Sequence, residues 1–140
     1  MAIVQGLTTS FKTQMLQAGQ NLATDTLKIA LYTGFATLGP ATTIYTTSNE
    51  VVGTGYTAGG IALTGVGISS NAEGVVYVTF NNAAWPNSSF TARCALLYNV
   101  TRSNASIAVL DFGADKTCTN QTFTVTMPLN SATTALIRFP

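Results

Sequence analysis

The sequence predicts a mainly β fold, an antiparallel β-sandwich or barrel-like domain of seven to eight strands with one short N-terminal α-helix. Three apolar runs, at residues 90–98, 107–112 and 122–127, have the length and the β-branched or aromatic content of strands. Two further runs, at residues 27–33 and 75–80, alternate between apolar and polar or small side chains. The 140 residues have the size of one domain.

The N-terminal segment, residues 1–8, is a candidate contact arm. Its apolar residues follow no clear period, so it predicts a fraying terminus in the free molecule, or an edge strand, or an arm that lies on a neighbouring molecule.

The helix signal follows the arm. Thr9 or Ser10 is the expected N-cap, Phe11, Met15 and Ala18 have the spacing of one helical face, and a glycine at position 19 is the expected C-terminal cap. A helix of two to three turns is unstable alone, so we expect its apolar face to dock on the sheet.

The next strand and the loop after it form the second expected contact region. Residues 27–33 predict a strand with Leu27, Ile29 and Leu31 on one face. Residues 34–48 contain mainly Gly, Pro, Ala and Thr, which predicts a long loop. Loops of this length in compact domains are usually functional or contact a partner.

The middle of the chain is rich in glycine. Residues 50–60 hold four glycines but lack the Lys-Ser or Lys-Thr pair of a phosphate-binding loop, so a bent or bulged edge strand is the better interpretation. Residues 61–69 alternate weakly, residues 71–74 predict a tight turn, and residues 81–89 predict a loop with Trp85 as a core plug or loop anchor. Residues 135–139 predict the last strand.

The three central runs predict an antiparallel meander. Residues 99–106 and 113–121 are rich in Asn, Ser, Thr and Asp and are the expected turns between its strands. Cys94 then lies in a strand as a small core residue, and Cys118 lies in a turn as a loose thiol. A bridge between them would need Cα atoms within about 7 Å.

Charge is scarce in this sequence. Only 8% of the residues are charged, against about 25% in typical domains, so the polar surface consists mostly of Thr, Ser, Asn and Gln and predicts self-association or membership of a larger assembly. The net charge is +1 with no basic cluster, which argues against nucleic acid as a partner. No apolar run is long enough to span a membrane and no signal peptide is visible, so we expect synthesis in the cytosol without a membrane partner.

The side chains that enzymes use most are missing. The sequence has no histidine, which excludes the His-dependent triads and the HExxH metal motif. Asp111 and Asp115 are the nearest carboxylates in the sequence, but a strand end and a turn explain them better than a catalytic pair. A calcium site formed by Asp111, Asp115 and Asn120 is conceivable, although its spacing is not that of an EF-hand.

Several short segments carry a family resemblance. They are residues 25–33 (DTLKIALYT), 53–60 (GTGYTAGG), 92–99 (ARCALLYN) and 108–116 (AVLDFGADK), joined by Phe11-Lys12, Tyr45-Thr46, Glu50-Val51 and Trp85. Together, from about residue 9 to residue 137, they resemble a family of small virion structural proteins of tailed bacteriophages.

The resemblance implies a non-enzymatic capsid cement or decoration protein without cofactors. Such a protein is assembled in the bacterial host cytoplasm and binds across subunits of the major capsid protein at the capsid surface. We also expect it to bind itself, as a homotrimer. The candidate contact residues are Ile3, Val4, Leu7, Phe35, Leu38, Ile44 and Tyr45.

Two other functions stay open at this point. A tail, neck or fibre-associated virion protein would have the same composition. A carbohydrate-binding module would need exposed aromatic side chains, for which the candidates are Tyr32, Tyr45, Tyr56 and Trp85.

Overall fold

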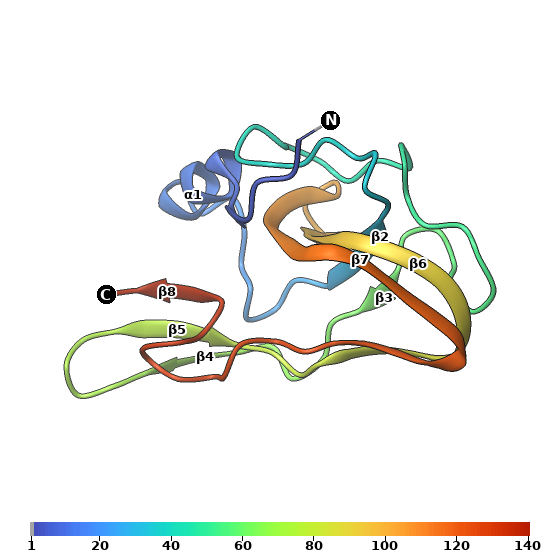
Figure 1. The fold of residues 1–140 in the computed structure, drawn as a ribbon. Coiled ribbons are helices and arrows are strands. Elements are labelled where there is room, and N and C mark those ends of the chain that lie inside the picture. The colour runs from blue at the N-terminus through green and yellow to red at the C-terminus, as the bar shows by residue number, and fades with distance from the viewer. Residues whose placement is uncertain (1) are drawn as a thin grey trace.

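The chain folds into two antiparallel sheets and one short helix (Figure 1). The structure is a computed structural model that describes residues 2–140, so Met1 of the expected arm lies outside the described residues. The elements in chain order are β1 (Gly6–Leu7), α1 (Thr9–Leu16), β2 (Leu27–Tyr32), β3 (Ile61–Ala62), β4 (Gly67–Ser70), β5 (Val76–Thr79), β6 (Ala83–Asn99), β7 (Ala105–Val125) and β8 (Ile137–Phe139). One sheet has the order β1-β7-β6-β2-β3 and the other β4-β5-β8. The predicted fold class is confirmed as two sheets, without closure into a barrel.

A long hairpin made of β6 and β7 organises the whole molecule. The two strands pair from Asn99↔Ala105 near the connecting turn to Ala83↔Val125 at the far end. In Figure 1 the hairpin crosses the upper part of the molecule, bends sharply at the right and returns along the bottom toward the second sheet. The register shifts at four places along this ladder, and such bulges allow a ribbon to bend this strongly.

The predicted meander is therefore wrong at its second turn. Residues 113–121 continue β7, although their composition is that of a turn. They lie on an exposed two-stranded ribbon, where polar side chains face water on both sides, and the Thr91 and Thr117 hydroxyls bond across it at 2.8 Å. Positive φ angles at Gly113 and Asn120 produce local irregularities instead of a chain reversal.

Two further expectations fail because segments that were expected to be loops or turns belong to the long strands β6 and β7. Residues 83–89 are not a loop, because β6 begins at Ala83 and places Trp85 in the core with 2% of its surface exposed. Cys118 is not a loose thiol, because it is buried in β7. Cys94 and Cys118 are both free and belong to different core clusters, and Cys94 pairs with Asp111, seven residues before Cys118 on β7.

The central sheet is buried on both faces. Leu27, Ile29 and Leu31 of β2 point into the main core. Ala30 and Tyr32 point to the other side, into a second cluster that is completed by residues from β6, β7 and the loop at 34–48. That loop therefore covers one face of the sheet, which explains why β2 is almost entirely buried.

The helix docks on the sheet as expected, with its ends shifted. Thr8 is the N-cap, because its Oγ1 accepts a hydrogen bond from the Phe11 N–H at 3.2 Å. Phe11 is fully buried, whereas Met15 is only partly buried and Ala18 is exposed. At the C-terminal end Ala18 adopts the left-handed conformation, with φ of 56°, one residue before the glycine that was expected there.

The second sheet consists of β4, β5 and β8, each of three or four residues. The weak pattern at residues 61–69 divides into β3, which joins the first sheet, and β4, which joins the second. The strands predicted near 75–80 and 135–139 are confirmed as β5 and β8. The turn before β5 is closed by Asn71, whose Oδ1 accepts hydrogen bonds from the Glu73 and Val75 N–H groups at 3.0 Å.

The glycine-rich segment at 50–60 is irregular and not the predicted edge strand. Its contacts with the sheet are the isolated bridges Tyr32↔Glu50 and Thr54↔Ser89 and single hydrogen bonds, such as that from the Val51 N–H to the Leu31 carbonyl at 3.0 Å. Gly60 has φ of +77°, and a Cβ there would lie 1.7 Å from the Ile29 carbonyl oxygen, so the position requires glycine. No helix among residues 2–140 has the length and apolar character needed to cross a membrane.

Candidate contact surface

The arm and the loop that were singled out in the sequence lie side by side in the structure. Ile3 and Leu38 form a parallel bridge, the Val4 N–H donates to the Leu38 carbonyl at 2.8 Å, and the Leu38 N–H donates to the Ala2 carbonyl at 2.9 Å. Two segments more than 30 residues apart thus form one surface, which we call the arm-loop surface (residues 2–7 and 34–48).

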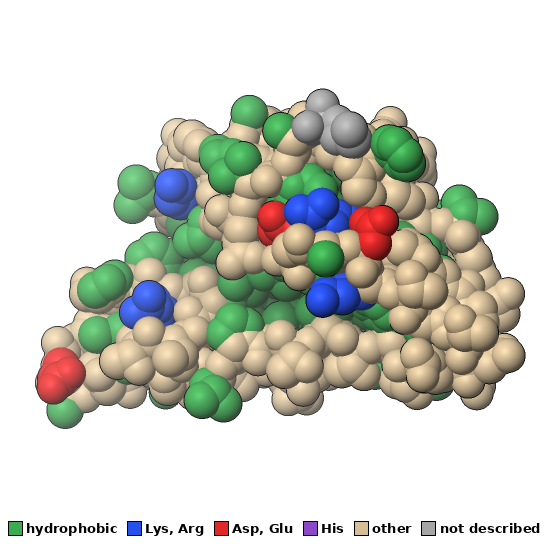
Figure 2. Space-filling view, viewed as in Figure 1, with side chains coloured by type: hydrophobic (Ala, Val, Ile, Leu, Met, Phe, Trp, Pro, Cys, Tyr) green, Lys and Arg blue, Asp and Glu red, His purple; other side chains and the backbone are tan. Residues whose placement is uncertain are grey.

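The arm-loop surface is hollowed and uncharged. A groove of about 430 Å³ runs between the two segments, with Val4, Leu38, Pro40 and Ile44 in its lining. The sequence contains no charged residue in either segment. Figure 2 shows apolar side chains at the top of the molecule, above its band of charged side chains.

The seven candidate contact residues divide by exposure. Val4, Phe35 and Ile44 are 50%, 71% and 52% exposed, so their side chains are available to a partner. Leu38 is buried, and Ile3 and Tyr45 are partly buried against the same core cluster. Leu7 is partly buried against the main core. The buried and partly buried members hold the surface in place, and the three exposed members are the ones that could touch a partner.

The groove also contains residues that were not singled out from the sequence. Pro40 and Ala2 line it, and the Pro40 carbonyl accepts a hydrogen bond from the Thr9 N–H at 2.9 Å. The signal that could have identified Pro40 is the unbroken uncharged run from residue 34 to residue 48, more than the identity of any single side chain.

Tyrosine side chains fix the loop from below. The Tyr45 ring stacks on the Tyr98 ring with 4.7 Å between centroids. The Tyr32 hydroxyl donates to the Thr46 carbonyl at 2.6 Å. Burial raises the pKa of Tyr98 to about 12, with a further contribution from the Glu50 charge, so this hydroxyl stays protonated at neutral pH.

A buried carboxylate connects the loop to the glycine-rich segment. Glu50 is 8% exposed and accepts hydrogen bonds from the Tyr45 hydroxyl at 2.7 Å, from the Gly59 N–H at 2.7 Å and from the Tyr56 hydroxyl. Burial and the bond to Glu50 raise the pKa of Tyr45 and of Tyr56. All three partners are donors, which is how a buried charge is stabilised. The cluster ties the loop to the glycine-rich segment, and it contains no nucleophile with an adjacent base.

Charged side chains gather on the outer face of the hairpin. Arg93 Nε lies 3.2 Å from Asp111 Oδ1, and both Asp115 and the Arg93 side chain lie beside Gly34. Asn120, the third residue of the conceivable calcium site, lies nine residues further along β7 and bonds to Ser89. Among the residues that the structure describes, no group of three His, Cys, Asp or Glu side chains is placed to hold a metal ion.

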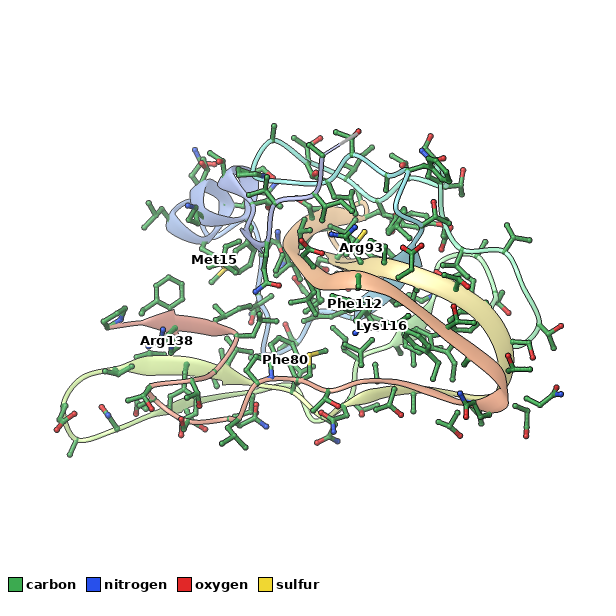
Figure 3. All side chains as sticks on the ribbon, in the orientation of Figure 1. Met15, Phe80, Arg93, Phe112, Lys116 and Arg138 are labelled. Carbon is green, nitrogen blue, oxygen red and sulfur yellow. The ribbon has the colours of Figure 1, made fainter. Side chains whose placement is uncertain are left out.

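A second hollow lies on the inner side of the bent hairpin. It has a volume of about 440 Å³, and its lining includes Phe112, Phe123, Leu136 and Lys116. Figure 3 shows Phe112 and Lys116 below the β7 ribbon and Arg93 above it. The lining is mainly apolar and also includes the charged residues Asp111 and Lys116.

The aromatic candidates for carbohydrate binding do not form an exposed platform. Tyr32 and Trp85 are 1% and 2% exposed. Tyr45 and Tyr56 are partly buried, and their hydroxyl groups are bonded to Glu50. Comparisons of the chain with protein-family models, with curated proteins and with solved structures find no match.

Proposed function

We propose that this chain is a non-enzymatic structural protein of a tailed-phage virion, a cement protein that binds across subunits of the major capsid protein through its arm-loop surface. It acts on the capsid surface as a homotrimer. The proposal joins the sequence resemblance to the geometry of the arm-loop surface.

One observation carries the proposal. The arm and the loop come together as an uncharged surface that exposes Val4, Phe35 and Ile44. Val4 and Ile44 line the groove, and Phe35 is exposed on the same loop outside this lining. Exposed apolar side chains on one surface are typical of protein-protein contact sites. A cement protein needs such a surface, because it binds many symmetric copies of a protein partner and performs no chemistry.

The backing of the surface also fits this role. The buried Leu38 side chain packs the loop into the core cluster that contains Tyr32, and backbone hydrogen bonds tie the loop to the arm. A surface held in this way loses little conformational entropy when it binds, which favours affinity.

The test is binding of the recombinant protein to capsid shells that lack it. We would compare the wild type with a Phe35→Asp/Ile44→Asp variant by co-sedimentation. Burial of one large apolar side chain contributes about 1.5–3 kcal/mol, so the double change should weaken binding by about 100-fold or more.

A matched control is Val52→Asp. Val52 is 93% exposed and lies outside the arm-loop surface, so this variant should bind capsid like the wild type. Equal binding by all three proteins would contradict the proposal, as would the absence of binding by the wild type.

Cryo-electron microscopy of the virion distinguishes the head from other locations. Many icosahedrally placed copies of a β-rich density of this size on the head are expected. Density at the tail or neck instead would favour the tail, neck or fibre-associated alternative.

A further inference from the structure

The second sheet ends in two open strand edges. It has the order β4-β5-β8, so β4 and β8 each pair on one side only. Apart from the ladder with β5, the polar contacts of β4 among the described residues come from the Thr79 hydroxyl. In Figure 1 this sheet projects to the left, away from the hairpin bend, with β8 on the side of α1 and β4 on the opposite side.

The edge of β4 is short, but it carries no side chain of the kind that prevents strand pairing. Its sequence Gly-Ile-Ser-Ser contains no charge and no proline. Natural sheets usually protect an exposed edge with lysine, proline, a bulge or a covering segment. An unprotected edge is a site where another strand can add to the sheet.

Apolar side chains extend along one face of this sheet beyond the core. Ile68 pairs with Val78 and Val78 with Ile137, so these three share a face, and Val76 and Phe139 form the next row on it. Val78 and Ile137 are buried, but Ile68, Val76 and Phe139 are 53%, 38% and 43% exposed. The exposed row reaches both edges, so a strand added at either one would place its own side chains beside these apolar residues.

The two charges of this sheet are opposite and lie beside different edges. Glu73 is in the turn that follows β4, and Arg138 is on β8 (Figure 3). Both side chains are exposed, and within residues 2–140 neither takes part in an ion pair. Because Arg138 pairs with Tyr77 and Glu73 precedes β5, the two charges lie toward the same end of the sheet.

We propose that β4 of one copy pairs with β8 of the next, head to tail, so that the second sheets of neighbouring copies join around the symmetry axis of a ring. The inference rests on the homotrimer of the proposed function and specifies the contact that forms it. The arm-loop surface stays free for the capsid.

The strand directions support a ring. β4 and β8 are both antiparallel to β5, so they run in the same direction within one copy. A rotation axis along the strands would therefore bring β4 beside β8 of the next copy in parallel and place Glu73 near the Arg138 of that copy. A head-to-tail contact of this kind closes into a ring when the rotation fits. A two-fold contact between β4 edges would leave Arg138 unused.

The first test measures mass in solution by size-exclusion chromatography with light scattering. The wild type should have three times the 14.6 kDa of one chain. Ile68→Lys introduces a charge at the centre of the edge without disturbing the buried residues, and its mass should fall threefold. Val52→Lys, at a 93% exposed position elsewhere, is the control and should remain trimeric.

Charge reversal tests the pairing of the two edges. Glu73→Lys and Arg138→Glu should each raise the concentration at which the trimer dissociates, by about tenfold at low salt because each ring contains three such joints. The double variant should restore the wild-type value. Both residues are exposed, so these variants test the contact even if Ile68→Lys does not fold.

Several results would overturn this contact. They are a monomeric or dimeric wild type, an unchanged trimer in Ile68→Lys, or a double charge reversal no better than the single ones. Capsid binding is measured separately with the Phe35→Asp/Ile44→Asp variant. A trimer that does not bind capsid would contradict the cement function and leave the edge contact standing, whereas a monomer that binds capsid would do the opposite.

Discussion

Replacing Tyr56 with phenylalanine should destabilise the fold far more than the loss of one oxygen atom suggests. The Tyr56 hydroxyl accepts a hydrogen bond from the Leu31 N–H at 2.9 Å and donates one to the Glu50 carboxylate. Burial, together with the bond to Glu50, raises the pKa of Tyr56, so the hydroxyl remains a donor at neutral pH. The substitution removes both interactions and keeps the ring that packs near Trp85 and Phe90.

The magnitude follows from the two lost partners. A hydrogen bond to a charged group contributes about 1.5–3 kcal/mol, and a buried N–H left without an acceptor costs about 1–3 kcal/mol. Glu50 would retain the Tyr45 hydroxyl and the Gly59 N–H, which moderates the loss. We therefore expect the free energy of unfolding to fall by about 2–5 kcal/mol. For a domain of this size this corresponds to a decrease in Tm of roughly 6–20 °C.

The assay is urea unfolding followed by circular dichroism, with Tyr77→Phe as the matched control. Tyr77 lies on β5, is partly exposed, and its hydroxyl has no hydrogen-bond partner among the described residues. The control should stay within about 0.5 kcal/mol of the wild type. If Tyr56→Phe is as stable as Tyr77→Phe, the Glu50 cluster does not stabilise the loop and the reasoning is wrong.

Three other predictions concern separate parts of the fold. The hydrogen bond from Arg102 is the main cause that lowers the pKa of Asp25 to about 2, so this carboxylate stabilises the folded state above pH 4. The Asp25→Asn variant should therefore be less stable than the wild type at pH 7. In acid-unfolding curves the difference in stability should disappear between pH 4 and pH 2. Cys94 and Cys118 should not react with Ellman's reagent until the protein is unfolded, because both are buried and burial raises the pKa of Cys94 to about 12; rapid labelling of the native protein would contradict their placement. Gly60→Ala should lower the free energy of unfolding by about 3 kcal/mol or more in urea titrations, because its Cβ would overlap a β2 carbonyl oxygen; a stable variant would show that this close approach is wrong.

Local sequence patterns were sufficient to predict a helix or strand where one face of the element is apolar and its length is ordinary. The alternation in residues 27–33 predicted β2 and the direction of Leu27, Ile29 and Leu31, and the buried Phe11 confirmed the docking of the helix. The grouping of the arm with the loop could not be predicted, because it depends on a bridge between Ile3 and Leu38, which are far apart in the chain.

Turn-forming composition misled the prediction in the hairpin. Asn, Thr and Asp favour turns, but they also suit a strand that is exposed to water, and residues 113–121 are exposed apart from Cys118. The same ambiguity placed Trp85 in a loop, because the strand that contains it is held by pairing with β7 more than by its own alternation.

By itself, the sequence determined the mainly β class, the single helix and the absence of histidine-dependent chemistry, since these depend on composition and on short-range periodicity. The tertiary structure decided which polar stretches are turns and which apolar side chains of the arm and the loop reach solvent. Leu38 and Ile44 come from the same uncharged run, yet one is buried and the other is 52% exposed. The physical reason is that burial here is set by pairing and packing between distant segments, which no local pattern records.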